Sequence, residues 1–96
     1  MSIFKAAFTR GASPINPEII EVTDKFVIYK KRKIYLIGYD TIMIPISKIS
    51  SVEINTGLIG TEIIIQSFGE GTITAHRFAL NDAKEIKRLL ESQLWH

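Results

Sequence analysis

The sequence predicts a mainly β domain, a partly open barrel of about seven antiparallel strands capped by one C-terminal α-helix and preceded by a short N-terminal extension. Two observations predict this fold. Between residues 18 and 79, short runs rich in isoleucine, valine, threonine and tyrosine alternate with turn-forming residues. After residue 79, the hydrophobic period changes from that of a strand to that of a helix.

The strand predictions rest on alternation of apolar and polar side chains. Ile42, Ile44 and Ile46 alternate with Thr41, Met43 and Pro45, which is typical of strands with one buried face. A brief non-extended break then precedes the next strand. Short connections containing Asn, Asp and Gly favour sequential antiparallel hairpins over parallel crossovers. The expected strands are residues 18–23, 26–31, 33–46 with an interruption near Gly38, 51–55, 61–68 and 72–79.

The closing segment has the pattern of an amphipathic helix. Asn81 is the expected N-cap, and the acidic residues Asp82 and Glu85 lie near the positive end of the helix dipole. A helix of about three turns would be the right size to plug the open end of a small barrel. The predicted apolar face consists of Ala83, Ile86, Leu90 and Leu94, widened by Leu89.

The N-terminal residues are expected to lie outside the main domain. Ile3, Phe4, Ala7 and Phe8 share one helical face, which predicts a short docked helix, with an amphipathic membrane or partner anchor as the alternative. The breakers Gly11, Pro14 and Pro17 follow. We therefore expect an extension over residues 1–17 and the main domain over residues 18–96.

Composition excludes several function classes. The chain of 96 residues contains no cysteine, which rules out disulfides, thiolate nucleophiles and thiolate metal sites. The net charge of +2 falls short of the basic excess of a dedicated nucleic-acid binder. His76 and His96 have no nucleophile or carboxylate at a spacing that suggests catalysis. We expect no catalytic residues, no metal site and no cofactor.

Two stretches of the sequence resemble bacterial pleckstrin-homology-like (PH-like) domains. Residues 22–29 (VTDKFVIY) match a strand, turn, strand pattern, and residues 44–54 (IPISKISSVEI) match the pattern I-P-x-x-x-I-x-x-V-x-x. The similarity covers roughly residues 18–94. Two departures are Phe26, where many members carry an arginine, and the extension before residue 18. The resemblance implies a partly open seven-stranded barrel that binds lipid head groups, peptides or protein surfaces, and ring-like self-association.

Two surfaces are candidates for such binding. The leading hypothesis is a protein-interaction module or homo-oligomeric scaffold, because the apolar excess over one small core has to be covered. Its partner would be a second copy or another protein, and its location the cytoplasm. The candidate interface residues are Ile42, Ile44, Ile64, Phe68, Leu94 and Trp95.

The alternative is a peripheral module at the inner membrane face that binds anionic lipid head groups. Its candidate patch is a run of cations with one more cation nearby. The residues are Lys25, Lys30, Lys31, Arg32 and Lys33. The competing interpretation of this run is a charged hairpin or edge that prevents aggregation.

Overall fold

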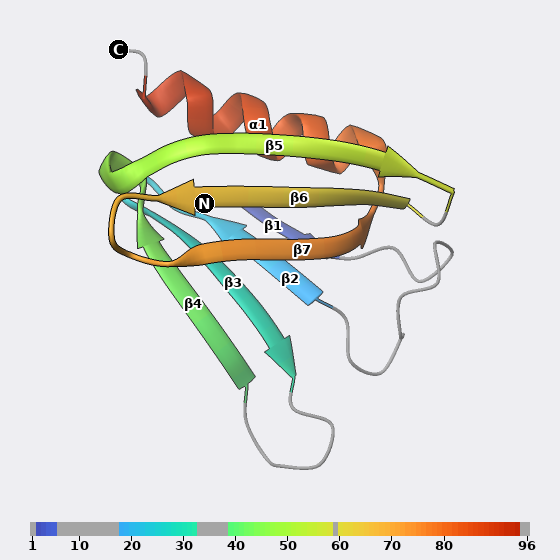
Figure 1. Ribbon diagram of the computed structural model, residues 1–96, viewed down its shortest axis with the longest axis horizontal. Coiled ribbons are helices and arrows are strands. Elements are labelled where there is room, and N and C mark those ends of the chain that lie inside the picture. The colour runs from blue at the N-terminus through green and yellow to red at the C-terminus, as the bar shows by residue number, and fades with distance from the viewer. Residues whose placement is uncertain (1, 6–17, 33–38, 59, 95–96) are drawn as a thin grey trace.

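The computed structural model describes residues 2–5, 18–32, 39–58 and 60–94 (Figure 1). These residues form seven strands, one short 3-10 helix and one α-helix. In chain order they are β1 (Ser2–Lys5), β2 (Glu18–Val22), β3 (Phe26–Arg32), β4 (Tyr39–Pro45), the 3-10 helix η2 (Ile46–Lys48), β5 (Ile49–Gly57), β6 (Gly60–Ser67), β7 (Thr72–Phe78) and α1 (Leu80–Leu94).

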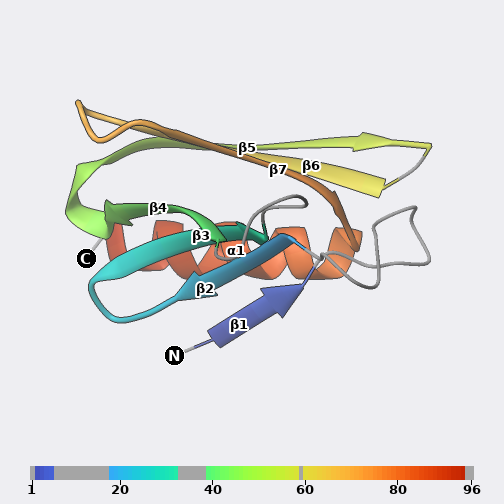
Figure 2. The ribbon, with the colours of Figure 1, turned by 90° about the horizontal axis from the view of Figure 1, so that it is seen from below.

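The strands form two antiparallel sheets that face each other without closing into a barrel. The first sheet has the order β1-β2-β3-β4 and the second has the order β5-β6-β7. Figure 2 shows the two sheets as separate layers, and Figure 1 shows α1 running beside β5. The predicted fold class, mainly β with antiparallel strands and a C-terminal capping helix, is confirmed.

Short polar side chains fix the connections of the first sheet. In the turn between β2 and β3, Thr23 Oγ1 accepts hydrogen bonds from the backbone N–H groups of Lys25 and Phe26, at 3.2 and 2.9 Å. The Lys25 carbonyl in turn accepts a hydrogen bond from the Ile46 N–H, at 2.9 Å. This bond attaches the β2–β3 turn to η2, which is the break predicted between β4 and β5. The turn is thereby held against the crossover from the first sheet to the second.

The core lies between the sheets and beneath the helix. Ile20, Val27 and Ile44 from the first sheet are fully buried. Ala83, Ile86 and Leu90 of α1 are fully buried too, and Leu89 packs against the core, so the predicted apolar helix face is confirmed at these positions. The second sheet contributes its own fully buried side chains, which are Ile63, Ile65, Ile73, Ala75 and Phe78.

The predicted cap of the helix is wrong. The α-helix begins at Leu80, and the Ala79 carbonyl accepts the first backbone bond from the Ala83 N–H at 3.0 Å. Asn81 therefore lies in the first turn, where it is exposed. Phe78, the last residue of β7, is fully buried, and the chain enters the helix almost directly from the strand, two residues earlier than the polar cap signal indicates.

The predicted N-terminal helix is also wrong where the chain is described. Residues 2–5 form β1, which pairs with β2 and places Phe4 opposite Ile20. Phe4 packs against the core while Ile3 is 55% exposed, which is the alternation of a strand. The first sheet thus includes residues that precede the expected start of the domain at residue 18. Ala7, Phe8 and the breakers of residues 11–17 lie outside the described residues.

Candidate interaction surface

The predicted basic patch does not form one surface among the described residues. Strand alternation sends Lys30 and Lys31 of β3 to opposite faces of the first sheet. Lys30 Nζ lies 3.7 Å from Glu21 Oε2 on the outer face. Lys31 lies opposite Glu18 of β2 and Asp40 of β4 in the strand register. Acidic residues therefore accompany both lysines.

The remaining cations of the predicted patch are separated from these two. Lys25 lies in the turn before β3 and is exposed, at the opposite end of that strand from Lys30. Four strand residues lie between them, and five residue steps of extended chain span about 17 Å. Arg32 is the last residue of β3, and its side chain, like Lys33, lies outside the described residues.

The predicted interface residues are also dispersed. Ile44 is fully buried between the sheets, so its side chain presents no surface to a partner and that prediction is wrong. Ile42 is half-buried and packs against the core, whereas Phe68 is 70% exposed beyond the end of β6. Ile64 is half-buried on the outer side of the second sheet. Leu94 is the last residue of α1, and its side chain lies outside the described part of the structure. Trp95 lies outside it as well.

A different apolar surface lies on the outside of the first sheet. The pairing register places Ile3, Glu21, Ile28 and Met43 in one row across all four strands. Alternation puts this row on the side opposite the buried Val27. Ile3 is 55% and Met43 49% exposed. We call this surface the first-sheet outer face; it comprises Ile3, Ile19, Phe26, Ile28, Met43 and Pro45, with Glu21, Lys30 and Thr41 as its polar members.

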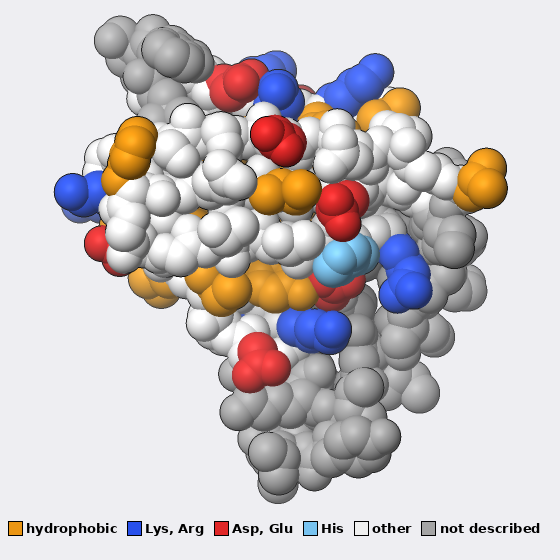
Figure 3. All heavy atoms as spheres, viewed as in Figure 1, with side chains coloured by type: hydrophobic (Ala, Val, Ile, Leu, Met, Phe, Trp, Pro, Cys, Tyr) orange, Lys and Arg blue, Asp and Glu red, His pale blue; other side chains and the backbone are white. Residues whose placement is uncertain are grey.

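The outside of the second sheet is polar. Its rows across the three strands are mainly hydroxyl, amide and charged side chains, and Ile64 stands among them as the apolar exception. Figure 3 looks onto this face and shows charged and other side chains around a central apolar spot, with a band of hydrophobic side chains along the lower border. We call it the second-sheet outer face; it comprises Ser51, Glu53, Asn55, Glu62, Ile64, Gln66, Thr72, Thr74 and His76.

The sequence carried a signal for the first-sheet outer face that alternation alone did not reveal. In residues 26–29 (FVIY), the side chains on both faces of the strand are apolar. If one face packs into the core, the apolar side chains of the other face must lie on the outside of the sheet. The same holds for Ile19 and Ile20 at the start of β2. Residues 63–65 show the same doubled apolar pattern as three consecutive isoleucines.

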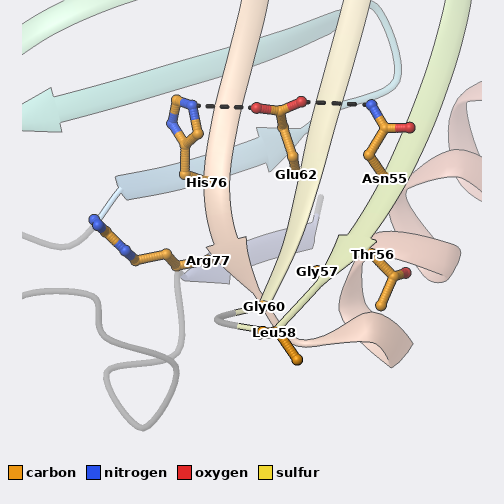
Figure 4. A pocket seen from close by; sticks show the side chains of 8 residues that line it. All are labelled: Asn55, Thr56, Gly57, Leu58, Gly60, Glu62, His76 and Arg77. Carbon is orange, nitrogen blue, oxygen red and sulfur yellow. Dashed lines mark hydrogen bonds and ion pairs between the residues drawn. The ribbon is translucent and has the colours of Figure 1, made fainter.

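A chain of polar side chains connects the two sheets at one edge. The Tyr29 hydroxyl donates a hydrogen bond of 2.5 Å to Oε1 of Glu18, a carboxylate that is only 7% exposed. His76 Nδ1 lies 3.6 Å from the same oxygen, and His76 Nε2 lies 3.4 Å from Glu62 Oε2. Asn55 donates to the other Glu62 oxygen at 3.4 Å, as Figure 4 shows. Burial and the neighbouring Glu18 carboxylate raise the pKa of Tyr29 well above its ordinary value.

This polar chain borders a hollow at the tip of the β5–β6 hairpin. The hollow has a volume of about 670 Å³ and is lined by hairpin residues 55–58 and Gly60, by Glu62, and by His76 and Arg77 of β7 (Figure 4). Within the described part of the chain, no group of three His, Asp or Glu side chains is arranged to hold a metal ion. The same residues include no helix long and apolar enough to cross a membrane.

Comparison with known proteins supports the architecture. The model of the bacterial PH domain family matches residues 3–92, which includes β1 and most of α1. No curated protein and no solved structure matches the chain. The match begins within β1, in agreement with the pairing of β1 to β2. With two antiparallel sheets, a C-terminal helix and a family model that spans nearly its whole length, the chain belongs to the bacterial PH domain family.

Proposed function

We propose that this PH domain is a non-enzymatic interaction module that associates with a second copy of itself through the first-sheet outer face. The family supports the coarser conclusion, because PH domains are generally interaction modules without catalysis. The single observation that carries the finer one is the exposed apolar row across β1, β3 and β4. Burying such a row contributes about 25 cal/mol for each Å² of apolar surface removed from water.

The charges on this face favour a second copy as the partner. Glu21 and Lys30 lie side by side in its interior, 3.7 Å apart, and are the charged side chains among its described members. Two such faces related by a two-fold axis can place the Glu21 carboxylate of each copy near the Lys30 ammonium of the other. Sheet faces of two copies can pack against each other about 10 Å apart with their strands nearly aligned.

The β4 edge of the first sheet can extend this contact. Among the described strands, β4 pairs with β3 alone and offers the other side of a seven-residue strand to another chain. From Thr41 to Met43 this edge carries no charged side chain of the kind that blocks edge pairing. The geometry supports self-association more than lipid binding, because Lys30 and Lys31 face opposite sides of the sheet and Lys25 lies at the far end of β3.

The test is a concentration series by size-exclusion chromatography with light scattering on the full chain, on Met43→Lys and on Thr74→Lys. Met43 lies on the first-sheet outer face, and Thr74 is exposed on the second-sheet outer face. We expect a multiple of 10.9 kDa for the full chain and for Thr74→Lys, and a monomer for Met43→Lys. A charge buried in an apolar interface without a partner prevents association.

Two results would contradict the proposal. One is a monomeric full chain at every concentration, and the other is an unchanged mass for Met43→Lys. Vesicle sedimentation distinguishes the membrane alternative. Salt-sensitive binding of a monomeric chain to anionic vesicles, weakened by Lys31→Glu, would replace protein association by lipid association as the function.

A further inference from the structure

The backbone at Arg77 adopts a conformation that arginine rarely takes. Its φ is 64°, and it is the non-glycine residue with positive φ in the described part of the chain. The cause is a bulge in the pairing of β6 with β7: Thr61 pairs with Phe78 and Ile63 with Ala75, so two residues of β7 oppose the single residue Glu62. A side chain in this conformation is strained, and glycine is the residue that avoids the strain.

The bulge has a specific effect on where the side chains point. In the regular part of β7, exposed and buried residues alternate, whereas His76 and Arg77 are consecutive and both exposed. Both side chains line the hollow described above. Figure 4 shows Arg77 extending from β7 on the same side as His76 and away from Glu62. The strained conformation therefore delivers the cationic side chain of Arg77 to the hollow beside His76, whereas regular pairing would have turned it to the other face.

The guanidinium of Arg77 is available to a ligand. It takes part in no ion pair or hydrogen bond with the described residues. Glu62, the nearest acidic member of the lining, already receives a hydrogen bond from Asn55 at 3.4 Å and lies 3.4 Å from His76. Both oxygens of Glu62 therefore already face neighbours on β5 and β7, and Arg77 extends away from it.

We propose that the hollow beside the β7 bulge binds an oxyanion, a carboxylate or a phosphate, through Arg77. The planar guanidinium matches the two oxygens of either group with paired hydrogen bonds. The His76 ring is a further polar member of the lining, while the fully exposed Leu58 at the hairpin tip is its apolar member. This site lies on the second sheet, so it is separate from the self-association surface.

The first test is an NMR titration of the full ¹⁵N-labelled chain with sodium phosphate and with sodium acetate, against sodium chloride at matched ionic strength. We expect saturable shifts at the amides of His76 and Arg77 with at least one of the two oxyanions. Saturation by phosphate alone or by acetate alone identifies which group the site takes. Shifts that chloride reproduces, or that rise linearly without saturating, overturn the proposal.

Variants of Arg77 separate binding from folding. Asn tolerates positive φ, so Arg77→Asn keeps the backbone while it removes the cation, and we expect its affinity to fall about tenfold or more. Arg77→Lys should bind with intermediate affinity, because lysine keeps the positive charge but lacks the planar guanidinium that makes paired hydrogen bonds. The control Lys48→Asn removes another exposed cation, in η2, and should bind as the full chain does. Equal affinity of Arg77→Asn and the full chain would overturn the site.

A thermal measurement tests whether arginine is kept at the bulge at the expense of stability. Arg77→Gly relieves the backbone strain and should raise the Tm by roughly 4 °C while binding is lost. Higher stability together with lost binding is the signature of a residue retained for a ligand. A lower Tm for Arg77→Gly would mean that the arginine side chain stabilises the fold, and the strain argument would fail.

Discussion

The two sheets of this domain distribute polar and apolar side chains in opposite ways. The second sheet follows the usual pattern of a half-buried antiparallel sheet, with Ile63, Ile65 and Ile73 buried inside and a polar outer face. The first sheet has an apolar row on its outer face, and it carries the buried hydrogen-bonded pair of Glu18 and Tyr29 on its inner side. Both sheets contribute to the same core, so the core alone does not explain the difference.

The difference is the basis for proposing self-association through the first-sheet outer face. A sheet face that stays in contact with water is expected to be polar, because an exposed apolar row favours association. The second-sheet outer face meets this condition. The first-sheet outer face departs from it at three of the four positions of one cross-strand row, and the charged side chains described on it, Glu21 and Lys30, pair with each other. An apolar outer face of this kind supports the proposed association with a second copy.

The largest expected effect concerns the polar pair inside the first sheet. Glu18→Ala removes the acceptor of the buried Tyr29 hydroxyl and should lower the free energy of unfolding by about 1–3 kcal/mol. The matched change outside the second sheet is Ser51→Ala, which removes an exposed hydroxyl that donates to Gln66 at 3.3 Å. That loss should stay within about 0.5 kcal/mol. Urea unfolding of both variants makes the measurement, and equal losses would show that the inner pair is not distinctive.

The second sheet is the part of the fold that sequence reasoning predicted best. Residues 51–55, 61–68 and 72–79 were each expected as strands and lie within or close to β5, β6 and β7. Alternation worked here because one face is polar: Val52 and Ile54 face inward, while Ser51 and Glu53 face outward. Glycines with positive φ, Gly69 at 80° and Gly71 at 92°, mark the hairpin between β6 and β7.

The first sheet was harder to predict for a physical reason. Where both faces of a strand are apolar, the period-two signal disappears, so neither the buried nor the exposed set can be assigned from one strand alone. β1 was mistaken for a helix because Ile3 and Phe4 are consecutive apolar residues. The first-sheet outer face depends on the register of four strands, and the bulge that exposes Arg77 depends on the register of two. Register is a property of the assembled sheet, so neither surface was accessible to local pattern reasoning.

An intermediate effect is expected from pH. The pKa of Tyr29 is raised in the folded state, so the native protein keeps this proton more strongly than the unfolded chain, whose tyrosines titrate near 10.0. Its contribution to stability is complete below pH 10 and is lost as the pH rises above that value, by up to about 1.4 kcal/mol for each pH unit. Unfolding free energies of the full chain and of Tyr29→Phe should therefore converge as the pH rises from 9 to about 11.

The converging curves isolate this one tyrosine. The other tyrosines of the chain are common to both proteins, so their titration cancels in the difference. A difference between the two proteins that stays constant over this range would mean that Tyr29 is as accessible to hydroxide as an exposed tyrosine. In that case the hydrogen bond to Glu18 would not be a feature of the inner side of the first sheet.

The smallest expected effect compares two isoleucines in equivalent positions. Ile28 and Ile64 are both half-buried, and each lies on an outer face in a strand with a neighbour on either side. Substitution by threonine removes similar apolar area, so in dilute protein each variant should lose about 1 kcal/mol of stability or less.

At high concentration, self-association adds stability to any chain that can still associate. The Tm of Ile64→Thr should therefore rise with concentration as that of the full chain does, while the Tm of Ile28→Thr should not. Parallel concentration dependence in the two variants would mean that the apolar row of the first sheet does not distinguish the two faces in solution.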